Sequence, residues 1–365
     1  MTAPSGMLEL PVCVEDITAD WLTLALSISC PGVQVLRLAH EEVLWGTGTK
    51  VCVRVAYNDA GQVAGLPTSL FVKGGFAEHR MIMEDCYELE VRFYRDLQPL
   101  LQLNVPRAFF AGSDLARRQH IVVLEDLRQR NVRFCRVQQP LTFEQAASHL
   151  DILAKMHARW WNAPGLADGS AIGPLTVWEP LPDKSIGVYQ WSRLEPDTWA
   201  DIMQLPRAVA IPKFMHDRKL MERALLQLTA FGHGGPHCLL HGDYHLGNLY
   251  FDADGRAGTL DWQSCRRGHW SHDVTYFLVS ALDIADRRRW DRALLQYYLT
   301  RLQAHGVSEP PDFDATWQAF RLQIIDGLYF WLVNPVEFQS EENNCAVAPR
   351  FAMAALDYDT FALIV

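Results

Sequence analysis

The sequence has no excess of basic residues, and this limits the partners it can have. It holds 33 Lys and Arg against 43 Asp and Glu, a formal net charge of -10 at pH 7. No long basic stripe offsets this deficit, so neither a nucleic acid nor an anionic membrane surface is an expected partner. The one dense basic run, residues 287–289, is interpreted as a solvated face of a helix.

Long apolar runs are also missing. No uninterrupted apolar segment approaches the ~20 residues that span a bilayer, so no transmembrane helix is expected. The N-terminal segment has no basic stretch and carries acids before its apolar run, which does not fit a signal peptide. The eight cysteines are scattered and form no Cys-x-x-Cys pair, as is typical of reduced thiols. These absences predict a cytoplasmic protein.

The two halves of the chain differ in their hydrophobic pattern. After a short helix over residues 14–28, with Thr18 as a possible N-cap, the first half shows strand-like alternation, as at Val51, Val53 and Val55. From residue 141 onward, long segments of helical period dominate. The pattern predicts an α+β, two-lobed protein, with a β-rich N-lobe at residues 1–127 and a mainly helical C-lobe at residues 128–365.

The densest polar chemistry lies in LLHGDYHLGNLYFDADGRAGTLDW, residues 239–262. Four residues separate Asp243 from Asn248 there. This D-x-x-x-x-N spacing is that of kinase catalytic loops, in which the Asp orients and deprotonates the attacking hydroxyl and the Asn holds Mg²⁺. The segment therefore predicts phosphoryl transfer.

The second part of the segment resembles a β-hairpin. The pair Asp254-Gly255 between two strand-like runs predicts a two-residue type I′ turn. A turn centred on this pair places Asn248 directly opposite Asp261. Oxygen-bearing side chains at opposed positions can converge on one small cation, which predicts that Asn248 and Asp261 are the Mg²⁺ ligands.

A different interpretation rests on the histidines at positions 233, 237, 241 and 245. A spacing of four would stack them on one helix as the metal site of a hydrolase, but the intervening Gly and Pro residues oppose such a helix. We interpret His241 as a residue that braces the loop and place His245 near a phosphate.

The N-lobe holds a candidate for the cation that phosphate groups require. Lys73 ends an apolar strand, and Glu90 lies on the apolar face of the helix predicted over residues 84–97. A carboxylate on that face needs a partner, and Lys73 is the natural one.

Two further N-lobe segments are candidate nucleotide contacts. In WGTGT, Gly46 and Gly48 allow a backbone to approach phosphates closely, although a tight turn between strands explains them as well. A buried strand ends at Glu125, Asp126 and Leu127, where the lobes are expected to join. The backbone groups of these residues are available to an adenine edge. The alternative is that they form an ordinary strand end.

Together these motifs resemble the aminoglycoside phosphotransferase and choline kinase-like superfamily, most closely its ecdysteroid kinase-like branch. The matching segments occur in the family's order over residues 15–305: GTGT, FVK, ELEVRFYRDL, VVLEDL, LAKMHARWW, HGDYHLGN, LDWQ and HDVTYFL. The resemblance implies ATP and Mg²⁺ as cofactors, Asp243 as the catalytic base, Asn248 and Asp261 as metal ligands, and an ion pair between Lys73 and Glu90.

The resemblance bears on other residues as well. It implies that residues 125–127 form the hinge and that Asp273 braces the catalytic loop, although a helix N-cap is an equal alternative for Asp273. His157 and Trp160 match a helix motif of the family, and we interpret both as packing residues. DWQ stands where protein kinases have D-F-G, and only eleven residues separate Asp261 from Asp273. This leaves no room for a segment that docks a peptide, so a small-molecule hydroxyl is the expected acceptor.

The expected function is an ATP- and Mg²⁺-dependent small-molecule kinase whose acceptor is unidentified. The alternatives are a nucleotide-binding pseudokinase and a metal-dependent hydrolase. Aromatic residues in two candidate substrate segments, 160–235 and 310–345, slightly favour a hydrophobic hydroxylated acceptor, although helix packing explains them equally well. They are Trp160, Trp161, Trp178, Trp191, Trp199, Trp317, Tyr329, Phe330 and Trp331.

Overall fold

The computed structural model describes residues 8–167 and 191–364, and the chain forms two units, Met1–Val132 (unit 1) and Arg133–Val365 (unit 2). Trp178 and the adjoining part of one candidate substrate segment lie outside the described residues. Among the helices that are described, none combines the length and apolar character needed to cross a membrane.

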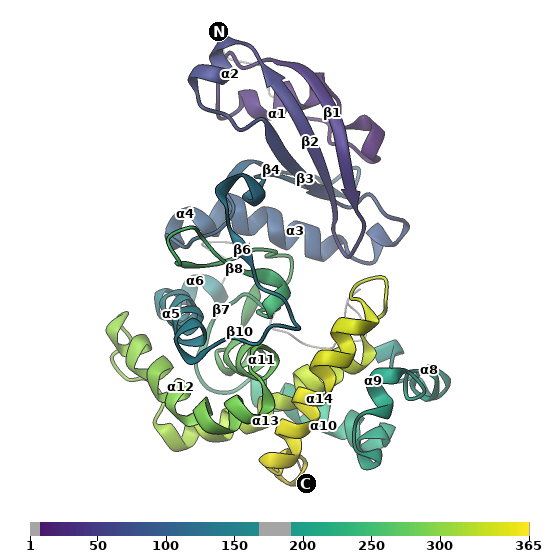
Figure 1. The fold of residues 1–365 in the computed structure, drawn as a ribbon, viewed down its shortest axis with the longest axis vertical. Helices are drawn as coiled ribbons and strands as arrows, with labels where there is room; N and C mark the ends of the chain where they lie inside the picture. Colours follow the sequence, from purple (N-terminus) through teal and green to yellow (C-terminus); the bar gives the residue numbers. More distant parts are fainter. Residues whose placement is uncertain (1–7, 168–190, 365) are drawn as a thin grey trace. The chain divides into compact units, whose positions relative to one another are not determined.

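Unit 1 contains a five-stranded antiparallel sheet in the order β1-β2-β3-β5-β4. Figure 1 labels four of its strands, β1 to β4. The strands are β1 (Val35–Leu44), β2 (Thr49–Tyr57), β3 (Ser69–Gly74), β4 (Ala108–Asp114) and β5 (Gln119–Glu125). The α-helices are α1 (Ala19–Ser27), α2 (Asp59–Val63), α3 (Glu84–Arg92) and α4 (Gln98–Leu101). The shorter helical turns are η1 (Val14–Asp16), η2 (Glu78–Met81), the π-helical η3 (Phe93–Leu97) and η4 (Leu127–Arg130).

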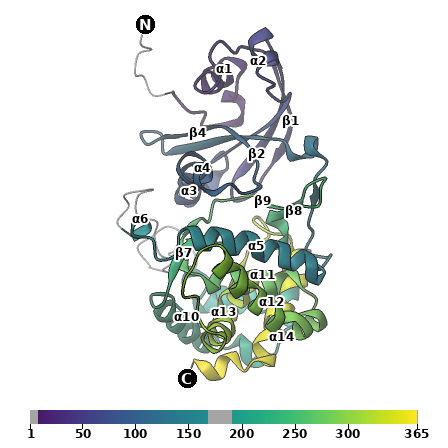
Figure 2. The same cartoon turned by 90° about the vertical axis from the view of Figure 1, so that its left-hand side faces the viewer.

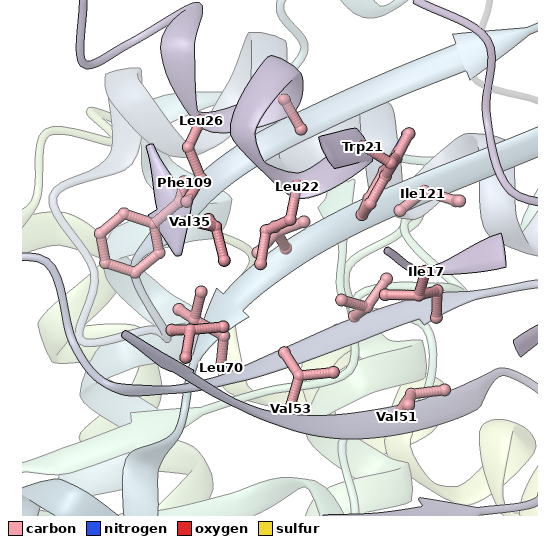
Figure 3. Packing of buried hydrophobic residues seen from close by; sticks show 14 of the residues in the cluster. Ile17, Trp21, Leu22, Leu26, Val35, Val51, Val53, Leu70, Phe109 and Ile121 are labelled. Atoms are coloured by element: carbon pink, nitrogen blue, oxygen red, sulfur yellow. The ribbon is translucent and has the colours of Figure 1, made fainter. Parts of the chain in front are cut away.

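Helix α1 covers one face of this sheet. Its first turn is capped by Thr18, whose hydroxyl accepts the N–H of Trp21 at 3.2 Å, as predicted. The helix buries Trp21, Leu22 and Leu26 in a cluster that also holds Val53 and Leu70 (Figure 3). Full burial of each such side chain contributes about 1.5–3 kcal/mol, so this cluster holds the sheet in place.

The opposite face of the sheet carries Lys73. Side chains alternate along a strand, so Leu70 and Val72 of β3 face the α1 cluster while Phe71 and Lys73 face the other way. Helix α3, which contacts β5 and β4, lies on this second face. The apolar face predicted for residues 84–97 is present, since Cys86, Glu90 and Phe93 are all buried.

Unit 2 is mainly helical (Figure 2). Its longer helices are α5 (Phe143–Arg159), α10 (Arg218–Gly232), α11 (Ser271–Ala281), α12 (Ile284–Ala304), α13 (Phe313–Val333) and α14 (Glu341–Asp357). The shorter ones are α6 (Pro164–Ala167), α8 (Pro196–Ile202), α9 (Pro206–Val209), η5 (Lys213–His216), η6 (Leu246–Asn248) and η7 (Thr360–Leu363). Helix α12 runs beside α5, and α13 packs against α10, α11 and α14 (Figures 1 and 2).

Two small sheets lie among these helices. One has the order β6-β8-β9, and the other pairs β7 with β10. Their strands are β6 (Arg133–Phe134), β7 (His237–Leu240), β8 (Leu249–Phe251), β9 (Ala257–Thr259) and β10 (Arg266–His269). Strand β10 was not predicted, because its sequence, Arg-Arg-Gly-His, has none of the apolar alternation that indicates a strand.

The hairpin of β8 and β9 differs from the prediction by one residue. Leu249 pairs with Thr259, and the N–H of Leu260 donates to the carbonyl of Asn248 at 3.0 Å, so Asn248 does not lie opposite Asp261. The two-residue type I′ turn is therefore wrong: the N–H of Asp252 donates to the carbonyl of Arg256 at 2.9 Å around a three-residue loop.

The Asp252 side chain explains this longer loop. Its Oδ1 accepts the backbone N–H groups of Asp254 and Arg256, and within the loop only Gly255 has a positive φ, of 77°. A type I′ turn needs positive φ at both central residues, whereas a three-residue loop needs it only at the last.

The basic run on α12 also differs from the prediction. Arg288 and Arg289 are exposed, but Arg287 is buried and donates to the Asp357 carboxylate and the Tyr358 hydroxyl. Arg287 lies four residues before the buried Asp291, on the inner face of the helix, so the interpretation as a solvated face is wrong for this residue.

Candidate active site

In unit 1, Lys73 and Glu90 form a buried ion pair between β3 and α3. Lys73 Nζ lies 2.8 Å from Oε1 and 2.7 Å from Oε2 of Glu90, and each side chain is 3% exposed. Because an unpaired charge at this depth would be strongly destabilising, each residue holds the other in place. The contact expected from the helical periodicity of residues 84–97 is present.

The glycine-containing loop joins β1 to β2 and is tied down through its carbonyl groups. The Tyr87 hydroxyl donates to the carbonyl of Thr47 at 2.6 Å, and His79 Nε2 lies 3.1 Å and 3.2 Å from the carbonyls of Gly46 and Thr47. Gly48, immediately before β2, is buried. The loop therefore joins two adjacent strands, and its contact with phosphates stays a prediction. Its anchors Tyr87 and His79 were not identified from the sequence.

The side chains at residues 125 and 126 are engaged within unit 1. The Glu125 carboxylate accepts the backbone N–H of Arg107 at 2.8 Å. Asp126 accepts the Ser69 hydroxyl at 2.8 Å and the Arg128 guanidinium at 2.9 Å. Burial acts to raise the pKa of Asp126, but these donors outweigh it and the pKa is lowered. Leu127 is buried, so any nucleotide contact here falls to the backbone.

In unit 2, the loop that carries Asp243 begins with a residue that must be glycine. Gly242 has φ 83°, and a Cβ atom built on it would lie 2.1 Å from the carbonyl oxygen of Ser264. The preceding His241 is fully buried. Its Nδ1 accepts the N–H of Asp243 at 3.3 Å, and its Nε2 lies 3.0 Å from the carbonyl of Leu260, to which it donates.

These contacts define the state of the His241 ring. Because Nδ1 accepts, the ring proton is on Nε2, and burial lowers the pKa of His241, which favours the neutral ring. The imidazole connects the residue that precedes Asp261 with the backbone of Asp243, so His241 braces the loop, as we had interpreted it.

Asp273 holds the same loop from α11. Its carboxylate accepts the N–H of His241 at 2.7 Å and of Gly242 at 2.9 Å, and His157 Nε2 lies 3.4 Å away. Burial acts to raise the pKa of Asp273, but the contact with His157 and nearby imidazoles outweighs it and lowers the pKa to about 2. The N-cap alternative is wrong, because the N-cap of α11 is Trp270.

Asp243 itself is bounded by polar groups and partly open. Asn248 Nδ2 donates to the Asp243 carbonyl at 2.9 Å and to Oδ2 at 3.1 Å, and His245 Nε2 lies 3.5 Å from Oδ2. The Asp243 side chain is 29% exposed, whereas that of His245 is 8% exposed. Burial acts to raise the pKa of Asp243, but the contact with the His245 imidazole outweighs it and the pKa is lowered. The carboxyl is therefore ionised near neutral pH.

Asp261 follows the last hydrogen bond of the β8–β9 ladder. It has φ 67°, a left-handed backbone that costs roughly 1–2 kcal/mol for a residue with a Cβ. Its charge acts on the pKa of both Asp243 and His241, so the carboxylate is an electrostatic neighbour of the loop. The Asn248 amide nitrogen is turned to Asp243, which leaves its oxygen as the ligand atom. An amide oxygen and a carboxylate are the hard donors that Mg²⁺ prefers, so these residues fit that ion.

The four spaced histidines do not assemble into a metal site. Across residues 8–167 and 191–364, no three His, Cys, Asp or Glu side chains are grouped in a way that could hold a metal ion. His237 Nε2 lies 2.8 Å from the carbonyl of Gly232, and His241 braces the loop as described. The histidine cluster that the hydrolase interpretation requires is therefore absent from the described residues.

Two aromatic residues lie near Asp243: Trp331, which belongs to the aromatic set listed from the sequence, and Tyr276, which was not singled out. Burial, followed by the charges of Asp243 and Asp326, raises the pKa of Tyr276 well above its ordinary value. The Tyr276 ring stacks on that of Trp331 at a centroid distance of 6.4 Å, and Trp331 packs edge-on against His245 at 5.3 Å. The helices α11 and α13 thus place an aromatic pair beside the loop that carries Asp243.

An antiparallel β unit with a buried lysine–glutamate pair, followed by a helical unit with an Asp-Asn-Asp set, is the organisation of a kinase-like phosphotransferase. Residues 84–310 match the model of the phosphotransferase enzyme family (APH), and the chain belongs to this family. Kinases of this family take the phosphoryl group from a nucleotide and transfer it to alcohol groups of small molecules. No curated protein shows significant sequence similarity to the chain.

Solved structures with the same α+β, protein-kinase-like fold include three small-molecule kinases. The chain superposes on Cryptosporidium parvum choline kinase with TM-score 0.53 and 10% identity, covering 94% of this chain and 98% of that one. The superposition on Plasmodium vivax ethanolamine kinase has TM-score 0.52 and 10% identity, and it covers 90% of this chain and 83% of that one. The superposition on a microcompartment-associated aminopropanol kinase has TM-score 0.51 and 15% identity, and it covers 94% of this chain and 98% of that one. At these identities the likeness establishes the fold.

Proposed function

We propose that this protein transfers the γ-phosphoryl group of ATP to a hydroxyl group of a small molecule in a Mg²⁺-dependent reaction. The observation that carries the proposal is the state of Asp243. Its loop is fixed by His241, Gly242 and Asp273, yet its carboxylate is ionised and partly exposed. A rigidly held, accessible carboxylate is what a general base for an alcohol requires.

In this mechanism Asp243 accepts a hydrogen bond from the acceptor hydroxyl and aligns its oxygen with the γ-phosphorus. As the new P–O bond forms, the bond to the β-phosphate oxygen breaks, ADP leaves, and the hydroxyl proton passes to the Asp243 carboxylate. The Asn248 amide, which donates to Oδ2 of Asp243, leaves Oδ1 to face the acceptor.

The remaining predicted residues act on the nucleotide. Lys73, held by Glu90, neutralises charge on the phosphates, and its fixed position costs no reorganisation during the reaction. Asn248 and Asp261 would hold Mg²⁺, which when bound supplies further neutralisation of phosphate charge.

The N-lobe loop and the hinge complete this part of the proposal. The loop with Gly46 and Gly48 approaches the phosphates, and the backbone of residues 125–127 meets the adenine edge. The burial of Leu127 and the engaged side chains of Glu125 and Asp126 are compatible with a contact made by backbone alone.

The acceptor is the least constrained part of the proposal. Of the aromatics that favoured a hydrophobic acceptor, Trp160, Trp199, Tyr329 and Trp331 are buried, so packing accounts for them. Only Trp331 also lies beside the loop, against His245. We retain a hydrophobic alcohol, the ecdysteroid kinase-like branch and a cytoplasmic location as parts of the proposal that rest on sequence motifs and composition.

A panel of acceptors tests this function. Sterol-like and aromatic alcohols, amino sugars and amino alcohols are each incubated with Mg²⁺ and ATP or GTP, and phosphorylated product is measured by mass spectrometry. We expect one class to be phosphorylated in a reaction that requires the Asp243 carboxylate. Nucleotide binding with neither transfer nor slow ATP hydrolysis would indicate the alternative, a pseudokinase.

A further inference from the structure

One buried carboxyl group in unit 2 has no part in the site described so far. Asp326 lies on α13 and is 1% exposed, and neither of its carboxyl oxygens accepts a hydrogen bond. Buried polar groups without a partner are rare because they lose their hydration without compensation. The group that faces Asp326 is the imidazole of His272, whose Nδ1 lies 3.3 Å from Oδ2.

His272 connects α13 with the catalytic loop. It is the second residue of α11, and its Nε2 lies 3.2 Å from the carbonyl oxygen of Gly242. The next residue, Asp273, accepts the N–H of the same Gly242 at 2.9 Å. Two consecutive residues of α11 therefore engage both polar groups of the glycine that precedes Asp243.

The carbonyl contact requires a particular proton arrangement. A ring nitrogen can donate to a carbonyl only when it carries a proton, so the 3.2 Å contact with Gly242 is a hydrogen bond only if Nε2 is protonated. One further proton is then shared by Nδ1 and the Asp326 carboxyl, and this pair is neutral overall. Burial raises the pKa of Asp326, which favours keeping that proton within the pair. Gln323, 3.2 Å from Nδ1, can donate or accept through its amide and is compatible with either tautomer.

We propose that Asp326 is a positioning residue for the catalytic loop, acting through His272 to keep the Nε2 proton directed at the carbonyl of Gly242. The inference rests on the proposed function of Asp243. Without the acid, Nδ1 can take the ring proton, the carbonyl loses its donor, and Asp243 is held less rigidly.

A neighbouring cation provides the competing arrangement. Arg266 Nη2 lies 3.0 Å from His272 Nε2, and a guanidinium can only donate. If Arg266 donated to Nε2, that nitrogen would be bare, and Nδ1–H would donate to an ionised Asp326. The two arrangements place the ring proton on different nitrogens, so the tautomer of His272 separates them.

The first test measures this tautomer directly. The protein is labelled with ¹⁵N-histidine, and the His272 ring signals are assigned by their loss in His272→Gln. We expect a protonated Nε2 in the wild type and in Asp326→Asn, whose amide can donate to Nδ1. We expect a shift of the ring proton toward Nδ1 in Asp326→Leu. A bare Nε2 in the wild type would overturn the proposal.

The second test asks whether the arrangement matters for turnover, with water as the acceptor in slow hydrolysis of MgATP. Asp326→Leu should lower kcat about 10-fold or more while the KM for MgATP stays unchanged, because a misplaced base slows the chemical step without altering nucleotide contacts. Asp326→Asn should retain most of the activity. If Asp326 only supported the fold, Asp326→Asn would not retain activity while Asp326→Leu lowered kcat at an unchanged KM.

Thr316→Val is the matched control. Thr316 is a buried residue of the same helix whose hydroxyl has no hydrogen-bond partner, so its loss should leave kcat unchanged. Wild-type kcat in a folded Asp326→Leu, or equal losses in the Asn and Leu variants, would overturn the proposal. If the wild type neither hydrolysed ATP nor phosphorylated any acceptor, the proposed function would fail instead, and the tautomer measurement would still decide the arrangement at His272.

Discussion

At the scale of single residues, the proposed base differs in exposure from the groups that hold its loop. Asp243 is the one member of the loop that is both ionised and partly exposed, whereas His241 and Asp273 are fully buried and direct their polar atoms at the loop backbone. Under the proposed function, Asp243 accepts the proton, whereas His241 and Asp273 only hold its loop in position. It also predicts different consequences for their replacement.

Asp243→Asn should preserve nucleotide binding and reduce turnover by about 100-fold or more, because the amide keeps the shape of the carboxylate but cannot accept the acceptor proton. Calorimetric titration with nucleotide and a turnover assay check the two parts. Asp254→Asn, a similar change at a carboxylate that is 74% exposed in the hairpin loop, should leave both unchanged. Near-normal turnover in Asp243→Asn would show that Asp243 is not the catalytic base.

Asp261→Ala should weaken Mg²⁺-dependent nucleotide binding far more than metal-free binding, since its carboxylate acts through the cation. The strained backbone of this residue, at φ 67°, fits a position retained for its side chain. Binding is measured with Mg²⁺ and with EDTA. Equal losses under both conditions would mean that Asp261 only supports the fold.

At the scale of elements, the catalytic loop depends on the packing of its backbone. Gly242→Ala introduces both a strained positive φ and a Cβ that would overlap the Ser264 carbonyl, whereas Gly255→Ala, at φ 77°, meets no atom within 4 Å. Gly255→Ala should therefore cost about 1 kcal/mol of unfolding free energy with full activity. Gly242→Ala should cost more and abolish turnover. Chemical denaturation and an activity assay measure both, and similar results for the two variants would contradict the role assigned to Gly242.

Asp273 links α11 to this loop and should make stability depend on pH. Its pKa of about 2 in the folded protein lies below the unfolded value of 3.8, so its stabilising contribution is present above pH 4 and is lost as the pH falls toward 2. The contribution at pH 7 is of order 2–3 kcal/mol. In Asp273→Asn the free energy of unfolding at pH 7 should fall, and the part of the acid dependence between about pH 5 and 2 should disappear. An unchanged pH profile would mean that Asp273 is not the group that titrates.

The elements also show what the sequence could predict and why it failed elsewhere. Glu90 was placed correctly because α3 is amphipathic, so one face of the helix identifies its inward residues. Helix α11 is buried on all sides, and no periodicity there separates Tyr276 from its neighbours. The hairpin register was wrong because Asp252 accepts two loop N–H groups and favours one additional loop residue. Such side-chain competition is not visible in a pattern of apolar residues.

At the scale of the whole molecule, each unit holds one of the two clusters described above. Unit 1 buries Lys73 against Glu90, and unit 2 buries His241 and Asp273 beside the partly exposed carboxylate of Asp243. Each cluster is held by contacts within its own unit, so each can be perturbed separately. Nucleotide affinity should respond to changes at Lys73, and turnover to changes around Asp243.

The net charge of -10 acts on every ligand at long range and must be separated from the acceptor site. A cationic amino alcohol is drawn to such a protein at low ionic strength, where the Debye length is about 30 Å at 0.01 M, but not at 0.15 M, where it is about 8 Å. If the acceptor site favours uncharged alcohols, the kcat/KM of a cationic acceptor should fall steeply as NaCl rises from about 20 to 300 mM, whereas that of a neutral alcohol should change little. A preference for cations that survives in 300 mM NaCl would show that a short-range site recognises the positive charge, and the hydrophobic acceptor would then be wrong.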